Sequence, residues 1–315
     1  MAKLSSKRAS ATHRVIVYGA SNTGKSLLAG KLSEHFNLIW FDLENGHETL
    51  FQLDPEWQDR IEVIEIPDTR SYPMAIETCL KVVKGPVDIC EAHGKVSCMI
   101  CRRKEQDVLN NSSPEDHGDI HDSFFTHVDL NSLDRDTIVV FDSMTQLSNS
   151  AIAHINKNQP DDYKLQHDDW GNLGKLLDIF LSHIQQAKYN VVVISHEVEA
   201  ETEGKKKTLV PVGGTRAFSR NMPKYFGETV YAERKNKKHV FASSTTYATT
   251  ILAGSRTGVV MEADKDVEGS LLQIFKPELY SSVSAVSKVS KISKPTGGDK
   301  ANDILARIKK LNKVK

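Results

Sequence analysis

Residues 14–32 read RVIVYGASNTGKSLLAGKL, and this stretch decides the fold. It begins with the apolar run Arg14–Tyr18, which has the composition of a buried strand. A glycine-rich turn follows and leads into a segment whose Leu27, Leu28 and Leu32 suit one face of a helix. A strand, a glycine-rich turn and a helix in this order predict one unit of a parallel sheet flanked by helices.

The turn contains a complete G-x-x-x-x-G-K-S phosphate-binding pattern. Its residues are Gly19, Ala20, Ser21, Asn22, Thr23, Gly24, Lys25 and Ser26, followed by Leu27 at the start of the helix. Glycines let backbone N–H groups turn toward phosphate oxygens, while Lys25 offers a charge to the β- and γ-phosphates and Ser26 a hydroxyl ligand for Mg²⁺. The pattern predicts binding of a nucleoside triphosphate. We expect ATP, because the sequence shows no N-K-x-D guanine signature.

Further apolar runs predict the rest of an α/β fold with a mostly parallel sheet. The expected strands are Leu38–Leu43, Ile61–Ile66, Thr137–Asp142 and Asn190–Ser195, and leucines and other apolar residues between 173 and 184 recur at helical spacing. Beyond residue 228, short runs follow one another without helices. They predict antiparallel strands at Glu228–Arg234, His239–Thr245, Tyr247–Ala253 and Leu271–Phe275.

Acidic residues at two predicted strand ends are candidates for catalysis. Asp142 has the position of a Walker B aspartate, which would hold Mg²⁺; by itself it could equally cap a helix. Glu44 follows the strand after the phosphate-loop helix, where a carboxylate could orient the attacking water. Asp42 competes for that role because strand alternation turns both side chains the same way, but Glu44 lies nearer the edge.

In their order, these motifs resemble the RecA-like ATPases, especially the phage-encoded members associated with single-strand annealing and recombination. That family has a phosphate loop, a strand end with a catalytic glutamate, a Walker B strand followed by Ser, and a strand ending in a polar γ-phosphate sensor. The corresponding residues here are Gly19–Ser26, Asp42/Glu44, Asp142-Ser143 and Ser195-His196. RecA has glutamine at the sensor position, whereas phage-type members more often have histidine. The resemblance covers about residues 12–260 and implies a core-only RecA-like ATPase.

The resemblance also implies two loops that contact single-stranded DNA. One corresponds to Val198–Val212 with Lys205, Lys206 and Lys207, followed by Gly213-Gly214 and Arg216. Three adjacent lysines are by themselves more often a solvated loop. The other loop corresponds to roughly Asn149–Asp169. Arg216 and Arg220 could contact either DNA or the nucleotide.

Arg256 is a further candidate, because related ATPases place a basic residue near this position that reaches a neighbour's nucleotide. Such a residue would stabilise charge in the transition state and would require a ring or a filament of subunits. The alternative is an arginine at a hairpin end in water.

An insertion near residues 84–130 carries a possible metal site. It contains Cys90-x2-His93-x4-Cys98-x2-Cys101, a ligand set that suits structural, tetrahedral Zn²⁺, with basic residues nearby to offset the thiolates. The alternative is a group of unmetallated thiols. His117, His121 and His127 could replace His93 as a ligand.

Composition limits the class of protein. The 315 residues carry 41 basic and 41 acidic side chains, which excludes a bulk polycation, and 39% hydrophobic residues exclude a wholly disordered chain. The charge is segregated: residues 281–315 carry eight Lys and one Arg against two Asp, net +7, which leaves −7 for the rest. We expect a flexible N-terminus (1–11), an ATPase domain (12–280), a flexible linker (281–300) and a basic tail or short helix (301–315).

Together these observations predict an Mg²⁺-dependent ATPase that binds single-stranded DNA in recombination or annealing. The alternatives are a nucleotide-gated adaptor with little turnover and an ATP-driven DNA motor or helicase. Expected partners are single-stranded DNA, further copies of the chain and a single-strand-binding protein, but no membrane. The start of the chain lacks the apolar stretch of a secretory signal, so we expect a cytoplasmic protein, in a bacterial host if it is phage-encoded.

Overall fold

The computed structural model describes residues 11–69, 72–201, 207–235, 238–243, 250–258, 271–277 and 279. The expected linker and basic tail, residues 281–315, lie outside this range, as do Lys205 and Lys206. Within the described residues, the chain up to Phe275 forms one compact unit.

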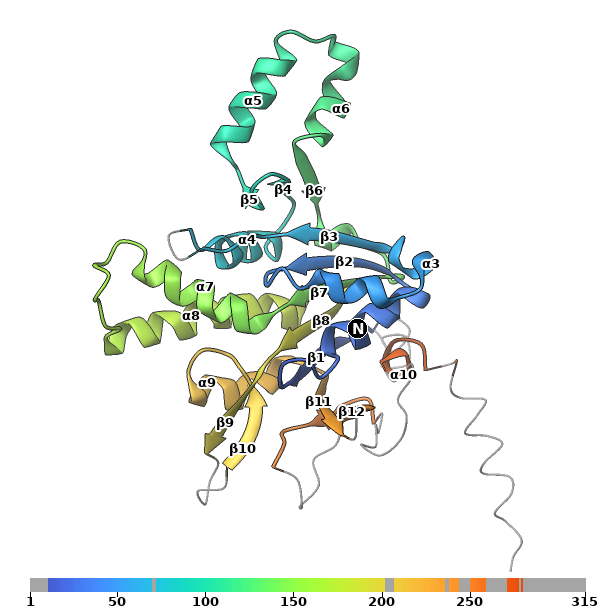
Figure 1. Cartoon of the computed structure of the whole chain (residues 1–315), viewed down its shortest axis with the longest axis vertical. Coiled ribbons are helices and arrows are strands. Elements are labelled where there is room, and N and C mark those ends of the chain that lie inside the picture. Colours follow the sequence, from blue (N-terminus) through green and yellow to red (C-terminus); the bar gives the residue numbers. More distant parts are fainter. Residues whose placement is uncertain are drawn as a thin grey trace, which may run out of the picture. The chain divides into compact units, whose positions relative to one another are not determined.

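The centre of this unit is an eight-stranded, mostly parallel sheet (Figure 1). Its strands, in spatial order, are β12 (Lys238–Ala242), β11 (Glu228–Lys235), β1 (Arg14–Gly19), β8 (Asn190–Ser195), β7 (Thr137–Asp142), β2 (Asn37–Asp42) and β3 (Ile61–Glu65), with β13 (Gly254–Ser255) also paired to β11. The six strands from β11 to β3 are parallel, and only β12 and β13 run antiparallel. The predicted fold class, a mostly parallel α/β sheet with antiparallel strands, is confirmed.

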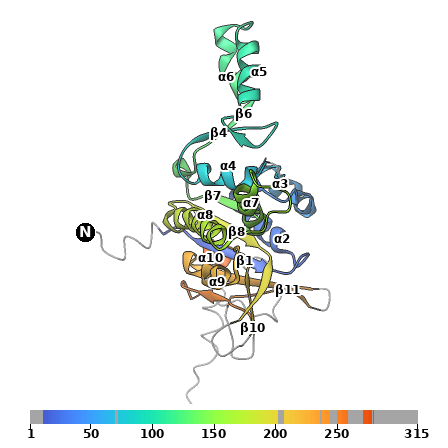
Figure 2. The same ribbon diagram turned by 90° about the vertical axis from the view of Figure 1, so that its left-hand side faces the viewer.

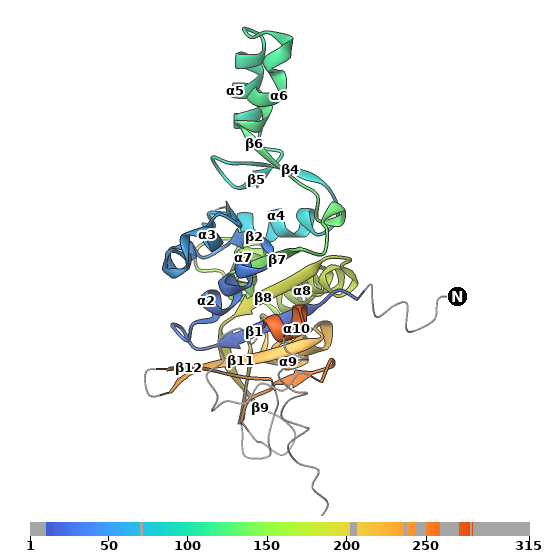
Figure 3. The same cartoon turned by 90° about the vertical axis from the view of Figure 1, so that its right-hand side faces the viewer.

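Helices cover both faces of the sheet, so strand residues that point to either face are buried. Ile16, Phe41 and Phe141 join the core formed by α4 (Met74–Val82), α7 (Met144–Asn156) and α8 (His167–Gln186). The residues next to them in sequence, Val17, Trp40 and Val140, point to the other face and are buried as well. Figures 2 and 3 show α2 (Lys25–Gly30) and α3 (Pro55–Gln58) on the side away from α8. Residues buried on both faces are typical of parallel strands.

Short helical segments complete the unit. The 3-10 helices are η1 (Lys31–Glu34), η2 (His47–Gln52), η3 (Pro114–Asp116), η4 (Leu130–Ser132) and η5 (Met222–Tyr225), and α9 (Arg216–Asn221) precedes η5. Together α9 and η5 return the chain to the edge of the sheet where β1 begins, so that β11 is parallel to β1. Glu228–Arg234, predicted among the antiparallel strands, is antiparallel to β12 and β13, but it joins the rest of the sheet through a parallel pairing with β1.

Two other predicted segments have a different structure. Leu271–Phe275, predicted as a strand, contains the helix α10 (Leu272–Phe275), whose Phe275 ring packs edge-on against His13 and Phe36. The expected DNA loop Asn149–Asp169 is shorter than predicted, since α7 continues to Asn156 and α8 begins at His167, which leaves residues 157–166 as the connection. Residues 244–249 lie outside the described residues, which removes the end of the predicted strand His239–Thr245 and the start of Tyr247–Ala253 from view. Within the latter, Ile251 forms a single bridge to Leu209.

The insertion is a small subdomain of its own. It has a three-stranded sheet in the order β5 (Lys95–Val96), β4 (Val87–Cys90) and β6 (Phe125–Val128), together with α5 (Met99–Leu109) and α6 (His117–Asp122). The two helices lie side by side (Figure 1), and His121 Nδ1 on α6 lies 2.5 Å from Glu105 Oε1 on α5.

Candidate functional site

The phosphate loop joins β1 to α2 at the carboxyl end of the sheet. Gly24 precedes α2 with φ of +85°, a left-handed conformation that glycine adopts without strain. A Cβ atom there would lie 2.7 Å from His239 Nδ1. A Cβ on Gly19 would lie 2.0 Å from the carbonyl oxygen of Ala232 on β11. Both glycines are therefore required by close packing as well as by the turn.

Lys25 lies inside the loop at the start of α2. Its Nζ donates hydrogen bonds to the carbonyl oxygens of Gly19 (3.1 Å) and Ala20 (2.6 Å). Burial lowers the pKa of Lys25, while the carboxylates of Asp142 and Glu44 act against this shift. These contacts hold the lysine side chain where the loop turns.

Ser26 and Asp142 come together from α2 and β7. The Ser26 hydroxyl donates to Asp142 Oδ2 at 2.8 Å. Burial raises the pKa of Asp142 to about 7, and the charges of Glu44 and Asp42 act in the same direction. A hydroxyl and a carboxylate oxygen are ligands that Mg²⁺ accepts, and a bound cation would favour the ionised carboxylate. The donor set therefore fits magnesium.

Glu44 and Asp42 have different environments. The Asp42 carboxylate is fully buried and accepts hydrogen bonds from the backbone N–H groups of Glu44, Gly46 and His47. It thus builds the turn after β2 and is occupied there. Glu44 accepts a hydrogen bond from the Ser143 hydroxyl, and its Oε2 lies 3.6 Å from His196 Nε2. Of the two candidates, Glu44 is the one that lines the nucleotide cavity.

The environment of Glu44 keeps its carboxylate ionised. Burial raises the pKa of Glu44, but the neighbouring His196, the hydrogen bond from Ser143 and the positive charge of Lys25 outweigh burial and lower the pKa below its usual value. An ionised carboxylate can accept a proton or a hydrogen bond from water.

His196 reaches the site because β8 lies between β1 and β7 in the sheet. The residue that follows β8 therefore falls between the phosphate loop and Asp142. Its backbone N–H donates to Thr145 Oγ1 (2.8 Å), and its Nδ1 lies 3.4 Å from Ser21 Oγ. His196 thus contacts residues of both neighbouring strand ends.

These residues line one cavity of about 370 Å³. Ser21 to Leu27 contribute to it with Glu44, Asp142 and His196. The sequence analysis did not identify Thr49, Gln52 and His239, which line it as well. His239 Nδ1 lies 2.9 Å from the carbonyl oxygen of Thr23. No local motif marks these three side chains, because η2 and β12 reach the cavity only through the tertiary fold.

The candidate DNA-binding residues that the structure describes, Lys207 and Arg216, lie on or just after a hairpin. The described part of Val198–Val212, expected as a loop that contacts DNA, belongs except for Val212 to β9 (Glu197–Glu201) and β10 (Lys207–Pro211), which pair with each other. Alternating Val198, Ala200, Thr208 and Val210 explain this pairing. Lys207 Nζ forms an exposed ion pair with Glu199 (2.7 Å).

The two arginines that follow are on α9. Arg216 begins this helix and is exposed. Arg220 Nη1 donates to the carbonyl oxygen of Glu201 at 3.2 Å, so its guanidinium is bonded to the hairpin.

Arg256 is far from the nucleotide cavity of its own chain. It follows β13, which pairs with the first residues of β11, and its N–H donates to the Gly227 carbonyl oxygen. Its Nη2 donates to the carbonyl oxygen of Lys224 at 2.9 Å. These contacts are at the amino end of the parallel strands, opposite the phosphate loop. Any contact of Arg256 with a nucleotide would have to be with one held by another chain.

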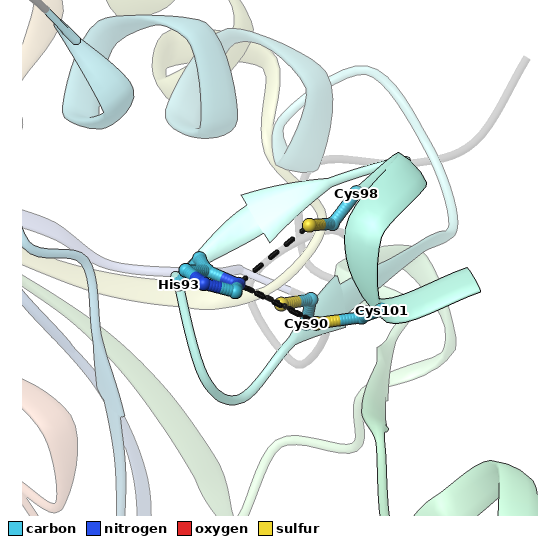
Figure 4. Close-up of side chains that lie close together, drawn as sticks. All are labelled: Cys90, His93, Cys98 and Cys101. Carbon is cyan, nitrogen blue, oxygen red and sulfur yellow. Dashed lines mark hydrogen bonds between the residues drawn. The ribbon is translucent and has the colours of Figure 1, made fainter. Parts of the chain in front are cut away.

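The predicted metal ligands form a second cluster (Figure 4). Cys90, His93, Cys98 and Cys101 each have one ligand atom within 4.8 Å of the others. Two of the alternative histidines are bonded elsewhere, His121 to Glu105 and His127 to Asp88. The third, His117, is exposed at the start of α6 and is not part of the cluster. The cluster is thus compatible with a zinc site that uses His93.

Three features define a P-loop nucleoside triphosphatase. They are the phosphate loop after β1, the acidic Asp142 at the end of β7, and the polar His196 after β8, which lies between these two strands. Residues 11–257 match the model of the AAA domain, and the chain therefore belongs to this family. No curated protein matches the sequence. The family match identifies the nucleotide-binding domain but does not single out the phage RecA-like group. Among the described residues, no helix is both long enough and apolar enough to cross a membrane.

Proposed function

We propose that this protein is an Mg²⁺-dependent ATPase that binds single-stranded DNA and acts in recombination or strand annealing. The observation that carries the ATPase part is the 2.8 Å contact between Ser26 and Asp142 in the cavity that Glu44 and His196 also line. Phosphoryl transfer needs a metal-binding group and a residue that orients the nucleophile, both facing the bound phosphates. Ser26 and Asp142 form the first, and Glu44 is the second.

In this proposal each residue has one role. Lys25 and the loop N–H groups bind the β- and γ-phosphates, and Ser26 and Asp142 hold Mg²⁺. When bound, Mg²⁺ neutralises phosphate charge. Glu44 accepts a hydrogen bond from the attacking water and orients it, while Ser143 and His196 fix the Glu44 carboxylate.

The β9–β10 hairpin supports coupling between nucleotide and DNA. Glu197, the first residue of β9, directly follows His196. The Val212 N–H, just after β10, donates to the His196 carbonyl oxygen at 2.9 Å, and the Ser195 hydroxyl donates to the Val212 carbonyl oxygen at 3.2 Å. Both ends of the hairpin are therefore bonded to the sensor segment. A shift of His196 upon phosphate binding would move the hairpin with Lys207, which directly follows Lys205 and Lys206 in the sequence, and with it the contact to phosphates of a single strand.

Two substitutions test the ATPase part. Lys25→Ala should abolish ATP binding, because it removes the buried ammonium of the phosphate loop. Glu44→Gln should retain ATP binding and lower turnover roughly 100-fold or more, as expected for removal of a general base. Turnover and nucleotide affinity are measured for both variants.

The matched control is Glu48→Gln, which changes an exposed carboxylate on η2 close in sequence to Glu44. It should leave both quantities unchanged. Turnover at the parent rate in Glu44→Gln would show that Glu44 does not activate water. Intact binding with negligible turnover in the parent chain would favour the nucleotide-gated adaptor.

A further inference from the structure

We propose that Cys90, His93, Cys98 and Cys101 bind one structural Zn²⁺, and that this ion fixes the insertion to the end of β3. The proposal concerns a site outside the nucleotide cavity and does not depend on ATPase activity.

The positions of the ligand atoms fit a tetrahedral ion. His93 Nδ1 lies 3.3, 3.6 and 3.4 Å from the sulfur atoms of Cys90, Cys98 and Cys101, and the Cys90 and Cys101 sulfurs are 3.2 Å apart. Zn–S bonds of about 2.3 Å and Zn–N bonds of about 2.0 Å in a tetrahedron separate the ligand atoms by about 3.5 to 3.8 Å. The three nitrogen–sulfur separations are within about 0.2 Å of the expected 3.5 Å, whereas the Cys90 and Cys101 sulfurs are closer together than in a zinc complex and would have to move apart by about 0.6 Å to bind the ion. The sulfurs are not in disulfides, since all three cysteines are free.

The local backbone brings the two ligand pairs together. Cys90 ends β4, and the Gly94 N–H donates back to the Cys90 carbonyl oxygen at 2.8 Å, so that His93 lies in the turn before β5. Cys98 is the N-cap of α5 and Cys101 lies three residues further along. Residues at this spacing share one face of a helix. The positive end of the helix dipole also favours thiolates at this position.

The charge of three clustered thiolates would need a cation. All three sulfur-bearing residues are buried, beside Phe125. Arg102 is one of the basic residues close to the cluster in sequence, but its guanidinium binds Asp88 (2.9 Å) and Glu105 (3.2 Å) and lies over the Phe125 ring. A divalent ion supplies the missing charge. Three thiolates and an imidazole favour zinc over Mg²⁺ or Ca²⁺, and four protein ligands leave no open position for catalysis.

The turn that carries His93 packs directly on the core. Gly94 has φ of +59°, and a Cβ there would lie 2.6 Å from the Glu65 carbonyl oxygen and 2.8 Å from Ile66 Cα. The Thr78 hydroxyl on α4 donates to the buried Gly94 carbonyl oxygen at 2.9 Å. An ion that fixes His93 therefore fixes the turn against the carboxyl end of β3. Without the ion, we expect this contact to open before the central strands do.

Metal analysis tests the binding directly. The full-length chain, expressed with zinc and passed through gel filtration, should contain about one zinc per chain by elemental analysis. Replacing zinc with Co²⁺ should give the visible absorption of a tetrahedral thiolate complex. The double variant Cys90→Ser/Cys101→Ser should lose both signals.

Cys79→Ala is the matched control, because Cys79 is buried in the main core and not in the cluster. It should retain the full zinc content. A folded parent chain without zinc that also gives no cobalt spectrum would overturn the proposal, and so would full zinc content in the double variant. The parent measurement needs no variant, so a misfolded mutant would not leave the question open.

Hydrogen–deuterium exchange tests the structural role. Removing zinc with a chelator, with neither nucleotide nor magnesium present, should raise exchange at least several-fold in residues 87–101 and 61–66. Residues 14–19 in the centre of the sheet should be unchanged. Unchanged exchange in 61–66 after complete zinc loss would show that the ion does not fix the insertion to β3.

Discussion

Glu44 and Asp42 are two residues apart at the end of β2, yet their carboxylates do different things. Asn45 has φ of +55°, and the chain turns there. The turn points three backbone N–H groups at Asp42 and leaves Glu44 facing the cavity. The alternation of side chains along a strand predicts that Asp42 and Glu44 point the same way. It fails here because Glu44 lies in the turn after the strand. Hydrogen bonding in the turn is what separates a structural carboxylate from a candidate catalytic one.

Arg256 gives a prediction at the scale of one residue. Because it is at the amino end of the sheet, Arg256→Ala should leave ATP binding intact. If it reaches a neighbour's nucleotide, turnover should fall about 10³-fold or more, as for other arginines that act across an interface.

Mixing two inactive variants distinguishes this role from a structural one. Arg256→Ala has an intact phosphate loop, and Lys25→Ala has an intact Arg256. In a mixed ring or filament, about one interface in four would combine the two intact halves, so turnover should reappear on mixing. No recovery in a mixture shown to co-assemble would contradict a role across the interface.

At the scale of elements, the β9–β10 hairpin is more acidic than the lysine run suggests. Glu197, Glu199 and Glu201 lie on β9, and Lys207 is paired with Glu199. Exposed pairs of this kind contribute little energy, so Lys207 can exchange this carboxylate for a phosphate.

Substitution of the lysine run tests whether the hairpin contacts DNA. Lys205→Ala/Lys206→Ala/Lys207→Ala should weaken binding to single-stranded DNA. The slope of log affinity against log salt should fall by about 2, as expected for three lost phosphate contacts. Affinity is measured by fluorescence anisotropy at several salt concentrations.

The control replaces three exposed lysines elsewhere, Lys81, Lys84 and Lys188, with alanine. It removes the same charge from other parts of the fold. Equal slopes in the two triple variants would mean that the hairpin makes no specific contact with the strand.

The elements also show what can be predicted from sequence. Thr137–Asp142 and Asn190–Ser195 match β7 and β8 in both bounds, because strands buried on both faces are apolar throughout. Leu271–Phe275 is a short apolar run of the kind that fits a helix or a strand equally well. Its structure depends on tertiary contacts, and in the folded chain the helical segment packs Phe275 against His13 and Phe36. The helix α7 was not predicted, and its residues 149–156 were expected to belong to a loop. A tertiary contact holds this part of α7 in the fold, because the buried Ser150 hydroxyl accepts a hydrogen bond from the Ile76 N–H.

The same distinction applies to the nucleotide cavity. Lys25, Ser26 and Asp142 could be assigned because each belongs to a local motif with a known chemical role. Thr49, Gln52 and His239 could not, since they reach the cavity from η2 and from the edge strand β12. Only the strand order shows that β11 lies next to the phosphate-loop strand β1, with β12 beyond it at the edge of the sheet.

For the whole molecule, charge is segregated although its sum is zero. Residues 1–280 carry −7 and residues 281–315 carry +7. An acidic body repels a nucleic acid backbone at long range, so any DNA contact must come from local basic groups. Such a contact would be strongly weakened by salt.

ATP turnover by the full chain, measured with and without single-stranded DNA across a salt series, tests the proposed function most directly. The account predicts Mg²⁺-dependent turnover that DNA stimulates several-fold at low salt, with the stimulation fading as salt rises. Turnover that is the same with and without DNA at every salt concentration would contradict a DNA-dependent ATPase.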